Sequence, residues 1–68
     1  KSILAKSLEA SLSRLDMTSI NLKTAKIVME ELCDWHACNV IDEAERTMNK
    51  AVEIIKGKLE EINNDGQY

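Results

Sequence analysis

The chain has 68 residues with nine basic and twelve acidic side chains, a net charge of −3, 44% apolar residues and two cysteines. This length excludes two separate cores, the acidic balance argues against the basic stripe of a nucleic-acid-binding domain, and two cysteines are too few for a secreted disulfide framework. The chain lacks Phe and Pro, has only two Gly, and is rich in helix formers, so we predict a single all-α domain over residues 1–68.

The sequence contains no apolar run near the roughly 20 residues of a membrane span and no signal segment. We therefore expect a cytoplasmic protein with no membrane partner. The start at Lys1, without Met, indicates a trimmed chain or a piece of a longer one. A domain of roughly 60 residues buries only about 60% of its unfolded surface, so we expect self-association or a protein partner to stabilise it.

Residues 2–15 are predicted to form a first helix, because Leu4, Leu8, Leu12 and Leu15 fall on one helical stripe. A helix of about four turns is marginal alone and has to dock on another element. The polar stretch 16–21 predicts a break, since Asp, Thr, Ser and Asn favour caps and turns.

A second helix is predicted over residues 19–37, with apolar residues on two sides. One side carries Leu22, Ala25, Met29, Leu32 and His36, and the other carries Ile20, Ile27, Val28, Trp35 and Cys38. A helix that is apolar on two sides is expected to be covered on both. Trp35 is either an anchor in a partner's pocket or the aromatic plug of the core.

A third helix is predicted over residues 40–62, with Asn39 as the break before it. Its apolar stripe repeats every seven residues and is filled in by four more apolar residues: Ile41, Ala44, Met48, Ala51, Val52, Ile55, Leu59 and Ile62. The alternative is one continuous helix from residue 22 to residue 62, roughly 60 Å long, which would need a second chain to cover it. We expect Leu32, Met48 and Ile55 to be buried and residues 63–68 to form a polar tail.

Cys33, His36 and Cys38 are the only cluster of metal-ligand types in the sequence. On a helix Cys33 and His36 share a side but Cys38 lies about 140° from Cys33, which argues against three convergent ligands and against a disulfide. A metal-organised domain using Cys33 and His36 is therefore a third hypothesis, and we predict no metal and no cofactor.

The sequence also argues against an enzyme, because so small a helical core offers no concave pocket for a nucleophile and base. A helix-turn-helix reader of DNA is disfavoured by the missing turn glycine and the acidic last helix. We predict a small three-helix arrangement with a long antiparallel helical hairpin, as an oligomer.

The predicted function is a protein–protein interaction module or small regulatory adaptor that packs apolar helix faces against a partner or a second copy. The alternative is a transcriptional or nucleic-acid-linked regulator, including an acidic inhibitor of a basic surface. The predicted partner-binding residues are Trp35, Ile20, Ile27, Val28, Ile41 and Val52.

Overall fold

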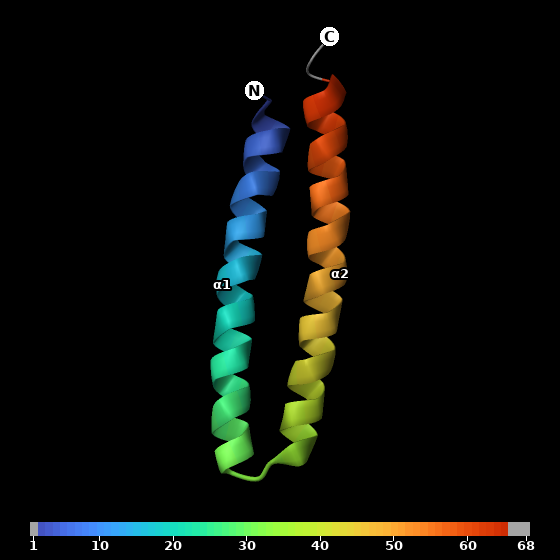
Figure 1. Cartoon of the computed structure of the whole chain (residues 1–68). Coiled ribbons are helices and arrows are strands. Elements are labelled where there is room, and N and C mark those ends of the chain that lie inside the picture. Colours follow the sequence, from blue (N-terminus) through green and yellow to red (C-terminus); the bar gives the residue numbers. More distant parts are fainter. Residues whose placement is uncertain (1, 66–68) are drawn as a thin grey trace.

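The computed structural model describes residues 2–65, which form two long helices joined by a short turn (Figure 1). Helix α1 spans Ile3–Glu31 and helix α2 spans Trp35–Asp65. The two helices run antiparallel, side by side, so the chain is a helical hairpin (Figure 1). The all-α prediction and the hairpin are confirmed, but the third helix is wrong.

Helix α1 continues through residues 16–21, where the sequence analysis placed a break. The hydroxyl groups of this helix point back along it: Thr18 Oγ1 donates to the carbonyl of Arg14 at 2.9 Å, and Thr24 Oγ1 to that of Ile20 at 3.1 Å. Such bonds satisfy the side chains without interrupting the backbone ladder. The N-terminus is capped by Ser2, whose hydroxyl accepts from the Ala5 amide at 3.1 Å.

The turn lies at residues 32–34, not at Asn39. The amides of Cys33 and Asp34 donate to the carbonyls of Glu30 and Met29, at 3.0 Å and 2.9 Å. This pair of bonds is a Schellman motif, and Cys33 occupies its left-handed position with φ 57°. Asp34 then caps α2, because its Oδ1 accepts from the Ala37 amide at 3.0 Å. The break at Asn39 and the continuous helix over 22–62 are therefore both wrong.

The two helices face each other along rows of residues at alternating spacings of three and four. The inner row of α1 is Ala5, Leu8, Leu12, Leu15, Ser19, Leu22, Lys26 and Met29. The inner row of α2 is Cys38, Ile41, Glu45, Met48, Val52, Ile55, Leu59 and Ile62. This spacing is the pattern by which helices pack along one another, and it contains the seven-residue repeat predicted for residues 41–62.

Few of these residues are fully covered. Among residues 2–64 only Ala5 and Cys38 are buried, at 1% and 5% exposure. Met48 and Ile55 are half-buried, and Leu32 is 68% exposed in the turn, so the burial predicted for Leu32 is wrong. Leu4, predicted on the docking stripe of the first helix, is exposed as well. Two helices cover each other on one side only, so their contact stays open to solvent at both edges.

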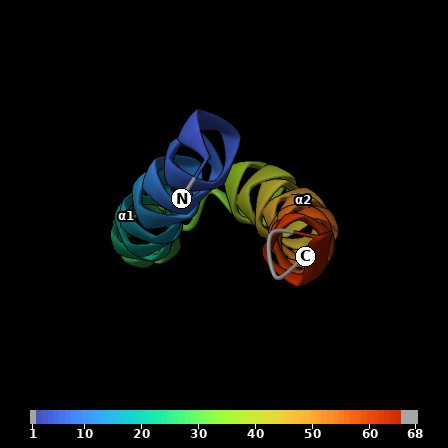
Figure 2. The ribbon, with the colours of Figure 1, turned by 90° about the horizontal axis from the view of Figure 1, so that it is seen from above.

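The hairpin is long and thin. Its Cα atoms extend over 55 × 15 × 10 Å with a radius of gyration of 15.8 Å, whereas a compact domain of this length has about 11 Å. Seen along its length, the helix axes tilt across each other and no third layer covers either helix (Figure 2). The described chain therefore has no closed core around which a deep site could form.

Candidate interaction surface

The most distinctive surface of the hairpin lies on α1, on the side away from α2. Its members are spaced by three and four residues, so they form one helical face, and all are exposed: Met17, Ile20, Asn21, Thr24, Ile27 and Val28. We call this set the outer face of α1. Ile20 is 55% and Ile27 60% exposed, values typical of charged surface residues rather than of isoleucine.

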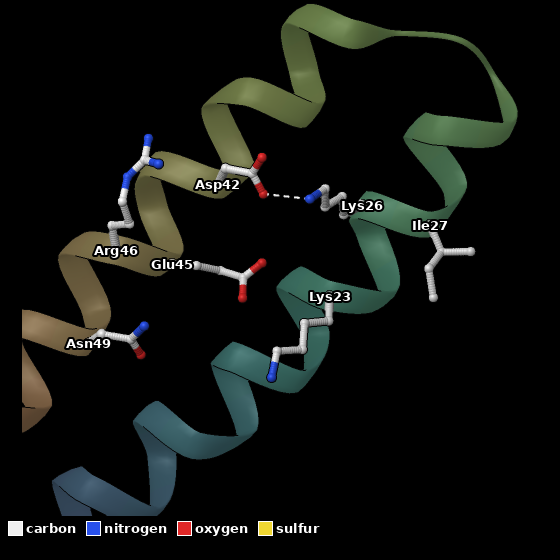
Figure 3. A pocket seen from close by; sticks show the side chains of 7 residues that line it. All are labelled: Lys23, Lys26, Ile27, Asp42, Glu45, Arg46 and Asn49. Carbon is white, nitrogen blue, oxygen red and sulfur yellow. Dashed lines mark ion pairs between the residues drawn. The ribbon is translucent and has the colours of Figure 1, made fainter.

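No charged side chain interrupts this face. Between Met17 and Val28 the charged residues are Lys23 and Lys26. Lys26 reaches Asp42 of α2 and Lys23 lines the groove between the helices, whereas the Ile27 side chain extends away from α2 (Figure 3). Asn21 and Thr24 are the two polar residues of the face, and the Thr24 hydroxyl, at its centre, donates to the Ile20 carbonyl at 3.1 Å. The outer face of α1 is thus an uncharged, largely apolar surface about 18 Å long at 1.5 Å per residue.

Helix α2 presents a different exterior. Its exposed residues away from α1 are mostly charged: Glu43, Arg46, Lys50, Glu53, Lys56, Glu60 and Glu61. The large apolar residues exposed on α2 are Trp35 at 60%, Val40 at 53% and Ile54 at 64%, and Ile54 lies beside the charged Lys50 and Glu53. Isolated apolar residues on a charged surface are ordinary, whereas a contiguous apolar face marks a surface that contacts something else.

A groove between the helices, of about 490 Å³, is the second surface feature (Figure 3). It is lined by Lys23, Lys26, Asp42, Glu45, Arg46 and Asn49, and Ile27, which also belongs to the outer face of α1, lies at its edge (Figure 3). Lys26 Nζ lies 2.6 Å from Asp42 Oδ1. This hydrogen-bonded pairing raises the pKa of Lys26 above its usual 10.5, against the opposing effect of desolvation.

The groove is better explained as part of the hairpin than as a ligand site. Its lysines come from α1 and its carboxylates from α2, and the Lys26–Asp42 ion pair links the two helices a few residues from the turn. The ion pair between these two residues sets the register of α1 along α2. Lys26 and Glu45 both lie in the inner rows. Polar residues at such packing positions set the alignment of two helices but add little stabilisation from apolar burial.

The predicted partner-binding residues divide into three groups. Ile20, Ile27 and Val28 lie together on the outer face of α1. Ile41 and Val52 are half-buried on the inner row of α2 and take part in the packing of the hairpin itself. Trp35, 60% exposed, begins α2 at the turn, so its interpretation as the plug of the core is wrong.

The cysteine and histidine cluster is dispersed by the turn. Cys33 is exposed and Cys38 is buried, both are free thiols, and His36 is exposed. Burial raises the pKa of the Cys38 thiol above 9.0, which keeps it protonated at neutral pH. In the part of the chain that the structure describes, no three His, Cys, Asp or Glu side chains gather as metal ligands.

Sequence reasoning missed Met17 because it fell in the break expected at 16–21, and it missed Thr24 because only residues of the helix predicted over 19–37 that are apolar, or His36, were assigned to its two sides. Extending the three-and-four spacing of Ile20 and Ile27 backward would have included Met17. Lys26 and Asp42 were missed as a pair because the turn was placed too late in the chain. Neither α1 nor α2, as far as they are described, has an apolar stretch long enough to cross a membrane.

No protein-family model matches this chain, and no curated protein or solved structure is significantly similar to it.

Proposed function

We propose that this chain is a non-enzymatic protein–protein interaction module, a small adaptor that binds through the outer face of α1. The observation that carries the proposal is the absence of any charge on six exposed positions of one helical face, four of which are Met, Ile or Val. The hairpin's own packing does not use this face, because α2 lies on the opposite side of α1.

The physical support is the free energy of burial. Covering apolar surface releases roughly 25 cal/mol per Å², and a fully buried Ile or Met side chain contributes about 1.5–3 kcal/mol. Helix faces with apolar anchors at such spacings are a common way for one protein to bind another. Trp35 lies near the turn-side end of the same hairpin and is proposed as an additional anchor, since Trp is enriched among binding hot spots.

The test is a photo-crosslinking amino acid placed at Ile27 or at Ile54 in the cells that make the chain. The two residues are both isoleucines with 60% and 64% exposure, on α1 and α2 respectively. We expect a crosslinked adduct, with a second copy or another protein, from position 27 and none from position 54. Equal adduct formation from both positions, or none from position 27, would contradict the proposal.

A further inference from the structure

We propose that the partner bound by the outer face of α1 is a second copy of this chain. Two hairpins would pack α1 against α1 about a two-fold axis near Thr24, with each α2 on the outside of a four-helix assembly. This inference rests on the proposed function and names the partner for it.

The hairpin exposes more surface than a folded monomer of its mass. The chain has an accessible surface of 5416 Å² at a mass of 7.7 kDa, whereas a folded monomer of that mass exposes about 4,300 Å². The difference is roughly 1,100 Å², and a stable interface covers roughly 800 Å² on each partner. Contact with one further copy would therefore reduce the exposed area of each hairpin to about the value expected of a folded monomer of its mass.

The centre of the outer face of α1 is apolar on both sides of Thr24, and a two-fold axis there places Ile20 level with Val28 of the second copy. The same axis places Ile27 level with Asn21 and Met17 level with Glu31, so the apolar contact is confined to the residues around Thr24. Each copy then contributes the same residues to both halves of the contact, as symmetric dimers require. The antiparallel alignment also opposes the dipoles of the two helices.

The exterior of α2 carries seven charged side chains, four acidic and three basic: Glu43, Arg46, Lys50, Glu53, Lys56, Glu60 and Glu61. Contact through α2 would take these charges out of water, whereas contact through the outer face of α1 leaves them in solvent. Of the two lysines between Met17 and Val28, Lys26 is paired with Asp42 of α2 at 2.6 Å and Lys23 lines the groove between the helices, so neither lies on the outer face itself.

The main experiment is sedimentation equilibrium of the full chain and of two matched variants, Ile27→Glu and Ile54→Glu. We expect the wild type to sediment with twice the 7.7 kDa mass of one chain at micromolar concentration. Ile27→Glu removes one buried isoleucine from each copy and should weaken the dimer about 100-fold or more, while Ile54→Glu should leave it unchanged. A wild type that stays a folded monomer throughout overturns the inference, as does an equal effect of both variants.

A second measurement covers the case in which Ile27→Glu unfolds as it dissociates. In a Cys33→Ser background, which removes the exposed native thiol, Thr24→Cys should oxidise to a disulfide-linked dimer because position 24 lies at the axis. Lys50→Cys, on the exterior of α2, should stay monomeric under the same conditions. No crosslink from Thr24→Cys, or equal crosslinking from Lys50→Cys, contradicts the inference.

The two proposals fail separately. If the wild type is monomeric but position 27 still forms adducts with another protein, the inference of a second copy is wrong and the proposed interaction module is retained. A monomeric wild type with no adduct of any kind from position 27 ends both.

Discussion

Helices α1 and α2 have almost the same length, 29 and 31 residues, and the same three-and-four inner row, yet their exteriors differ. Helix α2 is apolar on one side and mostly charged on the other, so a single neighbouring helix is enough to cover its apolar side. Helix α1 is apolar on both sides and has only one neighbour. A two-helix hairpin therefore covers the apolar side of α2 but leaves one apolar side of α1 exposed.

The inner rows sharpen this contrast along the length of the hairpin. Near the turn they contain Ser19, Lys26 and Glu45, and farther from it Leu12, Val52, Ile55 and Leu59, together with Leu8, Leu15 and Ile62. The outer face of α1 lies at the turn-proximal, more polar part. That part gains less from burial within the hairpin, so it is the part that a second layer would stabilise most.

The largest expected effect distinguishes the two sides of α2. Ile55→Asp places a carboxylate in the half-buried inner row and should cost about 2–5 kcal/mol, enough to unfold so small a hairpin. Ile54→Asp, at the adjacent exposed position, should cost less than about 0.5 kcal/mol. Thermal denaturation followed by circular dichroism measures both.

Met48→Asp provides a repeat of the same test one heptad earlier. Met48 is half-buried on the same row, so its substitution should act like Ile55→Asp. If both inner-row variants keep the fold and association of the wild type, the packing row assigned to α2 is wrong.

The repeat of α2 could be predicted from sequence because its apolar residues recur at seven-residue spacing on one side and most of its charges lie on the other. Ile41, Met48, Ile55 and Ile62 all lie on the side that packs against α1. The two-sided character of residues 20–29 was also predictable, since Leu22 and Met29 are half-buried and Ile20 and Ile27 exposed. Periodicity gives the faces of a helix even where it does not give its ends.

The residues at which the helices begin and end were not predictable from the periodicity of apolar residues. Thr18 and Ser19 resemble cap residues, but the Thr18 hydroxyl bonds within the helix and Ser19 lies half-buried on the inner row. The true turn has no Gly or Pro, and it uses Cys33 in a left-handed conformation that few residues other than Gly adopt. Asp34, the actual cap, lay inside the helix predicted over residues 19–37.

The boundary between the two helices gives the next prediction. Asp34→Ala removes the acceptor of the Ala37 amide and should destabilise the hairpin by about 1 kcal/mol, measured by urea denaturation. Asp34→Asn keeps an acceptor of the same size and should lose far less. Asn39→Ala tests the position that sequence reasoning favoured, and a greater loss there than at Asp34 would place the boundary elsewhere.

The charged exterior of α2 gives a stabilising variant. Gly57 lies inside α2, and a Cβ added there meets nothing within 4 Å. Gly57→Ala should therefore raise the free energy of unfolding by up to about 1 kcal/mol through helix propensity alone. It should leave the sedimentation behaviour unchanged, because this position is exposed and far from the outer face of α1; an altered mass would mean that α2 also takes part in the contact.

The smallest expected effect lies at the end of α1. Cys33 adopts φ 57°, a conformation that costs a residue with a Cβ about 1–2 kcal/mol and costs Gly almost nothing. Part of that gain is offset by the greater freedom of Gly in the unfolded chain, so Cys33→Gly should stabilise the hairpin by about 0.5 kcal/mol in urea denaturation. Cys33→Ala is the control, since it removes the exposed thiol but keeps the Cβ and should bring no gain. If Cys33→Ala stabilises as much as Cys33→Gly, the thiol rather than the backbone conformation limits the turn.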